Sequence, residues 1–155
     1  MFSVGDKIVH PLHGAGVVCG ISKKEINGNT ELYYSMEFIL DSVHIFLPVK
    51  MCETNGIRPP CSPEQAREIL ELLPQMQAEE ESGWNRRYRD NMLHIRSGNL
   101  AEVAQAAKNL WHRDQTHGLS AGEKRMLQSA RKILFSELSL VLQCDPKQIE
   151  QYLKK

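Results

Sequence analysis

The chain contains 155 residues, of which 41% are hydrophobic and 25% charged, and its 19 basic and 19 acidic residues give a formal net charge of zero. This composition is typical of a globular protein with one domain or two small ones. No apolar run approaches the roughly 20 residues that span a bilayer, and the N-terminus lacks a basic region followed by an apolar stretch. We therefore expect a cytoplasmic protein with no membrane partner.

Residues 1–56 predict a β module. Short segments rich in β-branched and aromatic residues lie at 7–10, 17–21, 32–38 and 43–48. The glycine-rich stretch 14–16 is interpreted as a break before the second segment. Asn27-Gly28 predicts a type I′ hairpin, because both residues readily take positive φ angles. Tyr34, Met36 and Phe38 share one strand face, and the spacing favours a small, strongly bent antiparallel sheet or barrel.

Residues 57–61 predict a linker that is stiffened by two prolines, and residues 62–155 predict an all-α module. Ser62 followed by Pro63 predicts a helix start, as does Asp145 followed by Pro146. Ser120 with Glu123 forms a capping box in front of the longest apolar stripe. A polar loop is expected at 114–118. The fold class is therefore a two-part α+β protein.

Basic residues are concentrated in the helical module. Residues 1–56 hold four basic and six acidic side chains, whereas residues 84–132 hold ten basic and four acidic ones. A local excess of this size is consistent with a polyanionic partner, although a basic helix face is also often only solvated.

The stretch from Gly83 to Arg89 combines one large aromatic side chain with three arginines. Arginine neutralises phosphate, and a projecting Trp84 can wedge against a base step. Helical spacing also places Trp84 in phase with apolar residues, which is compatible with a core tryptophan. Its position at a helix start favours projection. Trp111, by contrast, follows an apolar stripe and is interpreted as a core residue.

The remaining basic residues extend this candidate nucleic-acid site. Arg86, Arg89 and Arg96 fall on a different helix face from the apolar stripe and are suited to line a phosphate backbone. Lys124 and Arg125, just inside the capped helix, add to them, together with the backbone N–H groups of that helix start.

Signatures of catalysis are missing from the sequence, which has no phosphate-binding loop, dinucleotide fingerprint or nucleophile elbow. The four cysteines are scattered and are predicted to be free thiols. Metal sites at His10 with His13, at His112 with Asp114 and His117, or at the acidic run 79–81 are disfavoured against solvated side chains. We expect no enzymatic activity, no metal and no cofactor.

Three motifs in order resemble the CarD/CdnL transcription regulators. The first is Phe2-Ser3-Val4-Gly5-Asp6-Lys7-Ile8-Val9-His10-Pro11-Leu12-His13-Gly14, which alone also resembles the polymerase-binding module of the repair coupling translocase. The second is Trp84-Asn85-Arg86-Arg87-Tyr88-Arg89. The third is Gly118-Leu119-Ser120-Ala121-Gly122-Glu123-Lys124-Arg125-Met126-Leu127.

The resemblance implies a Tudor-like β module that docks on the RNA polymerase β subunit and a helical module that touches promoter DNA at the upstream edge of the melted bubble. It carries the role of a minor-groove wedge onto Trp84 and makes Arg86, Arg87 and Arg89 expected DNA contacts. Low sequence specificity is expected, because the hydrogen-bonding pattern of the minor groove is degenerate.

For the polymerase face, the resemblance points to basic residues near the first hairpin and before the proline that ends the β module. Lys24 fits the first position, but Phe46 and Leu47 precede Pro48, so the second basic residue is missing. The expected polymerase contacts are therefore Lys24, Ile45, Phe46 and Pro48, through an apolar contact or pairing along a strand edge.

These observations favour a transcription regulator that stabilises the promoter open complex and is nucleoid-associated through polymerase. The alternatives are a polymerase-docking adaptor without DNA contact and a free-standing architectural DNA-binding protein. The sequence does not fix the oligomeric state, for which a monomer is the default expectation.

Overall fold

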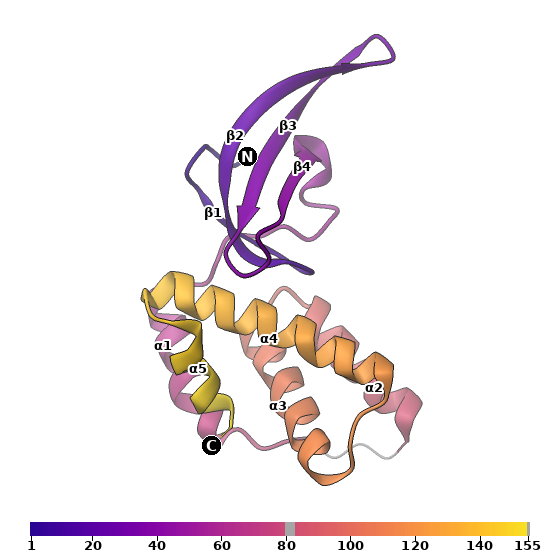
Figure 1. The fold of residues 1–155 in the computed structure, drawn as a ribbon, viewed down its shortest axis with the longest axis vertical. Coiled ribbons are helices and arrows are strands. Elements are labelled where there is room, and N and C mark those ends of the chain that lie inside the picture. Colours follow the sequence, from indigo (N-terminus) through magenta and orange to yellow (C-terminus); the bar gives the residue numbers. More distant parts are fainter. Residues whose placement is uncertain (80–82, 155) are drawn as a thin grey trace.

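The computed structural model describes residues 1–79 and 83–154; Glu80 and Glu81 of the acidic run, with Ser82, lie outside the described residues. The N-terminal part is one antiparallel sheet in the order β1-β2-β3-β4. Its strands are β1 (Lys7–His10), β2 (Gly14–Ile26), β3 (Asn29–Phe38) and β4 (His44–Pro48). The sheet is curled and stands on a group of helices, with the long β2–β3 hairpin reaching away from them (Figure 1). The two-part α+β fold is confirmed.

The hairpin turn has the predicted geometry. Asn27 and Gly28 both have positive φ angles, of 53° and 79°, as a type I′ turn requires. The predicted break at Gly14–Gly16 is wrong, because β2 already begins at Gly14. At Gly16 a Cβ atom would lie only 2.5 Å from the carbonyl oxygen of Glu37. These glycines therefore permit close backbone approach within a continuous strand.

The core of the β module lies on one face of the sheet. Tyr34, Met36 and Phe38 are all buried there, as their alternation predicts, and they pack with Ile8 and Val18. Neighbouring residues of β1 point to opposite sides, so that Val9 belongs instead to the core of the helices.

The helical part contains five α-helices in the described residues: α1 (Pro63–Leu72), α2 (Trp84–Arg96), α3 (Leu100–Thr116), α4 (Ala121–Leu142) and α5 (Pro146–Leu153). Two short 3₁₀ segments, η1 (Val49–Met51) and η2 (Leu73–Gln75), precede α1 and follow it. None of the described helices is both long and apolar enough to cross a membrane.

Side-chain caps define several helix starts, as predicted. Ser62 and Ser120 each form a capping box, and Asp145 caps α5. The predicted loop from Asp114 begins later, because α3 continues through Thr116. The helical geometry ends before Gly118, whose φ angle is 81°.

The 22-residue helix α4 lies at the centre of the molecule. One side packs on α2, α3 and α5, and its C-terminal half lies directly beneath the sheet (Figure 1). The segment that joins the two parts is held to the sheet, since Ile57 is buried in the β core and Arg58 exchanges two backbone hydrogen bonds with Val9. The first residues of the predicted linker therefore extend the β module.

Candidate nucleic-acid interface

The start of α2 does not follow the usual preferences of a helix N-terminus. Its N-cap is Gly83, which provides no side-chain hydrogen bond, and its first turn has no acidic residue. Arginines follow at once, although positive charge near a helix N-terminus is unfavourable. Local preferences are most often broken at functional sites, where the stability of the element is secondary.

Trp84 projects from this helix start. Its side chain is 46% exposed, and its ring stacks on Tyr88 with the centroids 5.0 Å apart. The indole Nε1 donates a hydrogen bond of 3.3 Å to the Oγ of Ser120, the N-cap of α4. Tyr88 in turn lies close to Gly122, where a Cβ atom would come within 3.3 Å of the tyrosine ring. The indole is thus fixed in position yet accessible to a partner.

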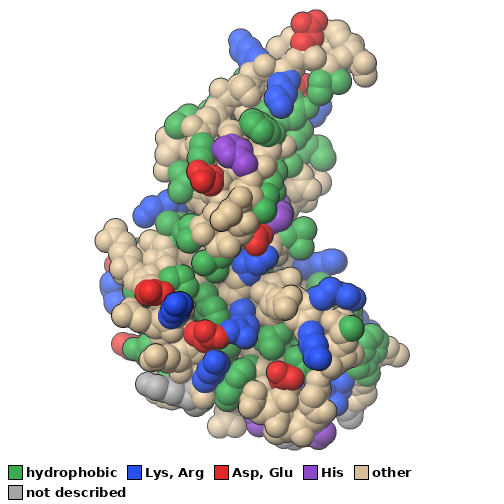
Figure 2. All heavy atoms as spheres, viewed as in Figure 1, with side chains coloured by type: hydrophobic (Ala, Val, Ile, Leu, Met, Phe, Trp, Pro, Cys, Tyr) green, Lys and Arg blue, Asp and Glu red, His purple; other side chains and the backbone are tan. Residues whose placement is uncertain are grey.

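Four basic side chains accompany Trp84 at the end of the module where α2 and α4 begin. Arg86 and Arg89 are exposed and lie 3.9 and 4.0 Å from carboxylate oxygens of Asp90, distances at which an exposed ion pair contributes little. Lys124 and Arg125 are exposed in the first turns of α4. Figure 2 shows Lys and Arg side chains among apolar ones where α4 passes in front of α2. These four basic side chains and Trp84 all belong to the N-terminal turns of α2 and α4.

Arg87 has a different environment from its neighbours. Its Nε donates a hydrogen bond of 2.9 Å to Glu123, and both side chains are largely buried. Burial alone would raise the pKa of Glu123, but hydrogen bonds from Arg87 and Ser120 outweigh it and lower that pKa. Arg87 therefore joins α2 to α4 from the inside rather than facing solvent with Arg86 and Arg89.

The capping box reduces the number of backbone N–H donors that the start of α4 presents to an anion. The backbone N–H of Glu123 donates to Ser120, and the Glu123 carboxylate accepts from the backbone N–H of Ser120. These two N–H groups are already used, and a buried carboxylate lies beside them. Two of the four N–H groups at this helix start are therefore committed to the cap, and the buried carboxylate beside them opposes a bound anion.

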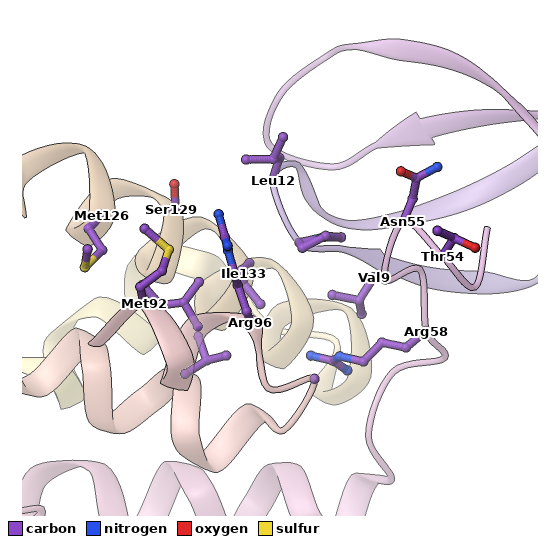
Figure 3. A pocket seen from close by; sticks show the side chains of 15 residues that line it. Val9, Leu12, Thr54, Asn55, Arg58, Met92, Arg96, Met126, Ser129 and Ile133 are labelled. Carbon is purple, nitrogen blue, oxygen red and sulfur yellow. The ribbon is translucent and has the colours of Figure 1, made fainter. Parts of the chain in front are cut away.

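Arg96 is not brought together with Trp84. It lies at the opposite end of α2, about 18 Å along the axis at 1.5 Å per residue. There it lines a cavity of about 470 Å³ between the sheet and the helices, together with Val9, Leu12 and Ile133 (Figure 3).

Three of the four predicted polymerase-contact residues share the outer face of the sheet. The Nζ of Lys24 lies 4.3 Å from the ring centroid of Phe46, which is 52% exposed. The register places Phe46 and Pro48 opposite Ser35 and Tyr33, away from the core. Ile45 lies opposite the buried Met36 and packs against the β core instead. Among the described strands, β4 pairs only with β3, so its other edge is open.

His10 and His13, two of the histidines singled out in the sequence, have hydrogen-bond partners within the β module. The Nδ1 of His13 lies 2.7 Å from Asp41, and the Nδ1 of His10 accepts from the backbone N–H of Leu12. Within residues 1–79 and 83–154, no three His, Cys, Asp or Glu side chains gather in a way that would hold a metal ion.

Sequence reasoning missed two residues that shape the site. Tyr88 follows Trp84 by four residues, a spacing at which helical side chains meet, and this signal was present. Ser120 lies 36 positions from Trp84, and nothing local to either residue indicates that they touch.

The fold joins a small curled antiparallel sheet to a group of helices, and each part carries one of the predicted contact surfaces. Family comparisons agree with this division. Residues 2–60 match the CarD-like/TRCF RID domain, and residues 68–154 match the CarD C-terminal domain.

The chain is also similar to individual proteins. The chain is 29% identical over 152 residues to "Putative transcription factor YdeB" of Bacillus subtilis (strain 168), covering 98% of this chain and 99% of that protein. A solution NMR structure of the 72-residue N-terminal domain of Myxococcus xanthus CarD matches 38% of this chain and 79% of that chain, at 27% identity and a TM-score of 0.33.

The protein belongs to the CarD family of transcription factors. Its N-terminal RID domain implies RNA polymerase binding, so membership implies transcription regulation through polymerase, without enzymatic activity.

The internal role of Arg87 gives a stability prediction. Arg87→Ala should lower the free energy of unfolding by about 3–5 kcal/mol, because it leaves Glu123 as an unpaired buried charge. Since the pKa of Glu123 is lowered in the folded state, this contribution is present at neutral pH and is lost as the pH falls through that pKa. Urea unfolding at several pH values measures both effects. Arg89→Ala is the control and should change stability by less than about 0.5 kcal/mol; equal losses in the two variants would contradict the assignment.

Proposed function

We propose that this protein docks on the RNA polymerase β subunit through the outer face of its sheet and stabilises the promoter open complex by contacting DNA at the upstream edge of the melted bubble. Trp84 is the wedge in this proposal, and Arg86, Arg89, Lys124 and Arg125 are the phosphate contacts. The observation that carries it is the half-exposed indole, stacked on Tyr88 and hydrogen-bonded to Ser120, amid exposed basic side chains.

The geometry suits a minor-groove contact. A large side chain inserted beside a base step must be supported from behind, because unstacking the step costs a few kcal/mol. Tyr88 and Ser120 provide that support, and the basic residues around them supply attraction that does not depend on sequence. The donor and acceptor pattern of the minor groove is degenerate, so low sequence specificity follows.

Three residues that the sequence predicted to contact DNA or polymerase are not part of the proposed contacts, because of where they lie. Arg87 is held by the buried Glu123, Arg96 lies at the other end of α2, and Ile45 packs into the β core. The remaining polymerase contacts are Lys24, Phe46 and Pro48, with the edge of β4 beside them.

The proposed mechanism is a shift in population. A protein that binds the open promoter better than the closed one favours opening by the difference in affinity alone. Wedging is an interaction that the melted fork offers and the intact duplex resists. Docking on polymerase raises the local concentration of the helical module at the fork, so affinity for isolated DNA can be weak. The net charge of zero agrees with such weak independent binding.

The central test is Trp84→Ala. Stacking or wedging by one aromatic is worth roughly 1–3 kcal/mol, so the open-complex lifetime should fall by about five- to a hundred-fold. Affinity for the β subunit should not change. Stability should fall by only about 1 kcal/mol, the scale of one exposed aromatic pair.

Leu93→Ala is the matched control, because Leu93 is an apolar residue on the same helix with 62% exposure. Its open-complex lifetime should equal that of the unaltered protein. An unchanged lifetime in Trp84→Ala, with polymerase still bound, would favour an adaptor without DNA contact. Tight DNA binding without polymerase would favour an architectural protein.

The basic residues predict a salt effect. Arg86→Ala and Arg89→Ala should each weaken DNA binding and reduce the slope of log affinity against log salt by up to about one unit, because each removes one phosphate contact. Arg67→Ala, an exposed arginine on α1, is the control. Slopes that are identical in all three variants and the unaltered protein would exclude direct phosphate pairing.

The docking face predicts a charge effect. Lys24→Glu should weaken binding to the β subunit, since it reverses the charge beside Phe46 on the outer face. Lys23→Glu makes the same change on the opposite side of the strand and should bind normally. Surface-immobilised β subunit allows both affinities to be measured with the full-length chain. If Lys23→Glu binds as weakly as Lys24→Glu, overall charge is responsible and the outer face is not the docking site.

A further inference from the structure

A buried acidic residue joins the two modules. Glu137, on α4, is fully buried and accepts hydrogen bonds of 2.6 and 2.9 Å from the guanidinium of Arg58. It also accepts a 2.8 Å hydrogen bond from the backbone N–H of Cys61. One carboxylate thus holds the chain segment that leaves the sheet against the helix that lies beneath it.

The preceding turn of α4 holds the sheet itself. Ser136 accepts a 2.8 Å hydrogen bond from the backbone N–H of Ala15, 121 positions away. Gly14 lies so close that a Cβ atom would be 2.9 Å from the Lys132 carbonyl oxygen and in conflict with Ser136. The Nζ of Lys132 pairs with Asp41 at 2.8 Å. These contacts fix the sheet in one orientation on α4.

The same helix also carries the candidate DNA site. Its first turn is joined to α2 by Arg87 with Glu123 and by Trp84 with Ser120. From Glu123 to Glu137 the helix rises about 21 Å at 1.5 Å per residue. Met126, Ala130 and Ile133 are buried along the way, so the helix between the two ends is packed and continuous.

We propose that α4 is a rigid spacer that fixes the distance and direction from the polymerase-docking face to Trp84, and that Glu137 is its positioning residue. The proposal rests on the function proposed above. A flexible link would bring Trp84 to the fork only part of the time, whereas a fixed one avoids the ordering cost on binding.

A buried ion pair is weak evidence for stability, because apolar residues of similar volume often stabilise as well or better. The arrangement around Glu137 instead fixes the orientation of the two modules. The guanidinium of Arg58 and one backbone N–H can all donate to this carboxylate in only one relative placement of the sheet and α4. A role in orientation therefore accounts for a fully buried charge at this junction better than a role in stability.

The test uses Glu137→Gln in the full-length protein. Glutamine keeps the shape and one acceptor but cannot balance the charge of Arg58. Backbone ¹⁵N relaxation should show one rotational correlation time for both modules in the unaltered protein and two shorter ones in the variant. Binding to the β subunit should be unchanged, while the open-complex lifetime should fall several-fold.

A double-mutant cycle separates positioning from general stability. If Glu137 acts by placing Trp84, then adding Glu137→Gln to Trp84→Ala should cause no further loss of lifetime, whereas independent effects would multiply. Multiplying effects, or a variant that keeps a single correlation time, would overturn the inference. A normal lifetime in Trp84→Ala would instead refute the proposed function itself.

A second variant changes the sheet side of the contact between the sheet and α4. Gly14→Ala adds a Cβ atom that conflicts with Lys132 and Ser136, so it should also produce two correlation times and a shorter lifetime. Gly5→Ala is its matched control, because Gly5 also has a positive φ angle but nothing lies within 4 Å of its Cβ position. If Gly14→Ala and Gly5→Ala behave alike, the close approach of sheet and helix does not matter and the inference fails.

Discussion

Helix α4 must satisfy three sets of neighbours at once, and the rest of the structure depends on that constraint. Its apolar side is covered by α2, α3 and α5, its first turn takes the buried pair Arg87–Glu123, and its C-terminal half holds the sheet. A helix in this position cannot shift or rotate without breaking contacts at every level. The β module has a small core of its own and gains part of its support from this helix.

The start of α2 shows how local stability and the proposed function oppose each other. An acidic N-cap and acidic first turn would stabilise this helix, but they would also repel a polyanion. The chain instead places Gly83, Trp84 and exposed arginines there. The unfavourable interaction with the helix dipole is offset by Arg87, whose ion pair with Glu123 attaches the helix to α4. Two arginines adjacent in sequence therefore have opposite roles: Arg86 faces solvent, whereas Arg87 supports the helix from within.

The features that sequence predicted well are those whose causes are local. The type I′ turn at Asn27-Gly28 follows from the φ angles of two residues, and the capping box at Ser120 follows from a spacing of three. The alternation of Tyr34, Met36 and Phe38 likewise requires only the pleat of one strand. The CarD-family resemblance was also readable, because its three motifs occur in order.

The features that sequence did not predict depend on distant partners. Nothing near Arg87 reveals Glu123, which is 36 positions away, and nothing near Glu137 reveals Arg58, 79 positions away. Arg96 shares a helix face with Arg89. It nevertheless lines the cavity between the sheet and the helices, because it is the last residue of the long helix α2. Gly14 was interpreted as a break, because glycine often interrupts strands. The structure shows another reason for a glycine here, which is that α4 approaches too closely for a Cβ atom.

The zero net charge and the basic helix start are compatible because the two act over different distances. At physiological salt, exposed charges interact over about 8 Å, so distant acidic residues act little on a phosphate beside Trp84. Far from the site the charges cancel, which limits non-specific attraction to DNA elsewhere. Under the proposed function, a chain arranged in this way gains little from long-range electrostatic steering and depends on docking to polymerase for delivery to its site. The open edge and outer face of the sheet are the surfaces that such delivery would use, and α4 then determines where the indole is placed.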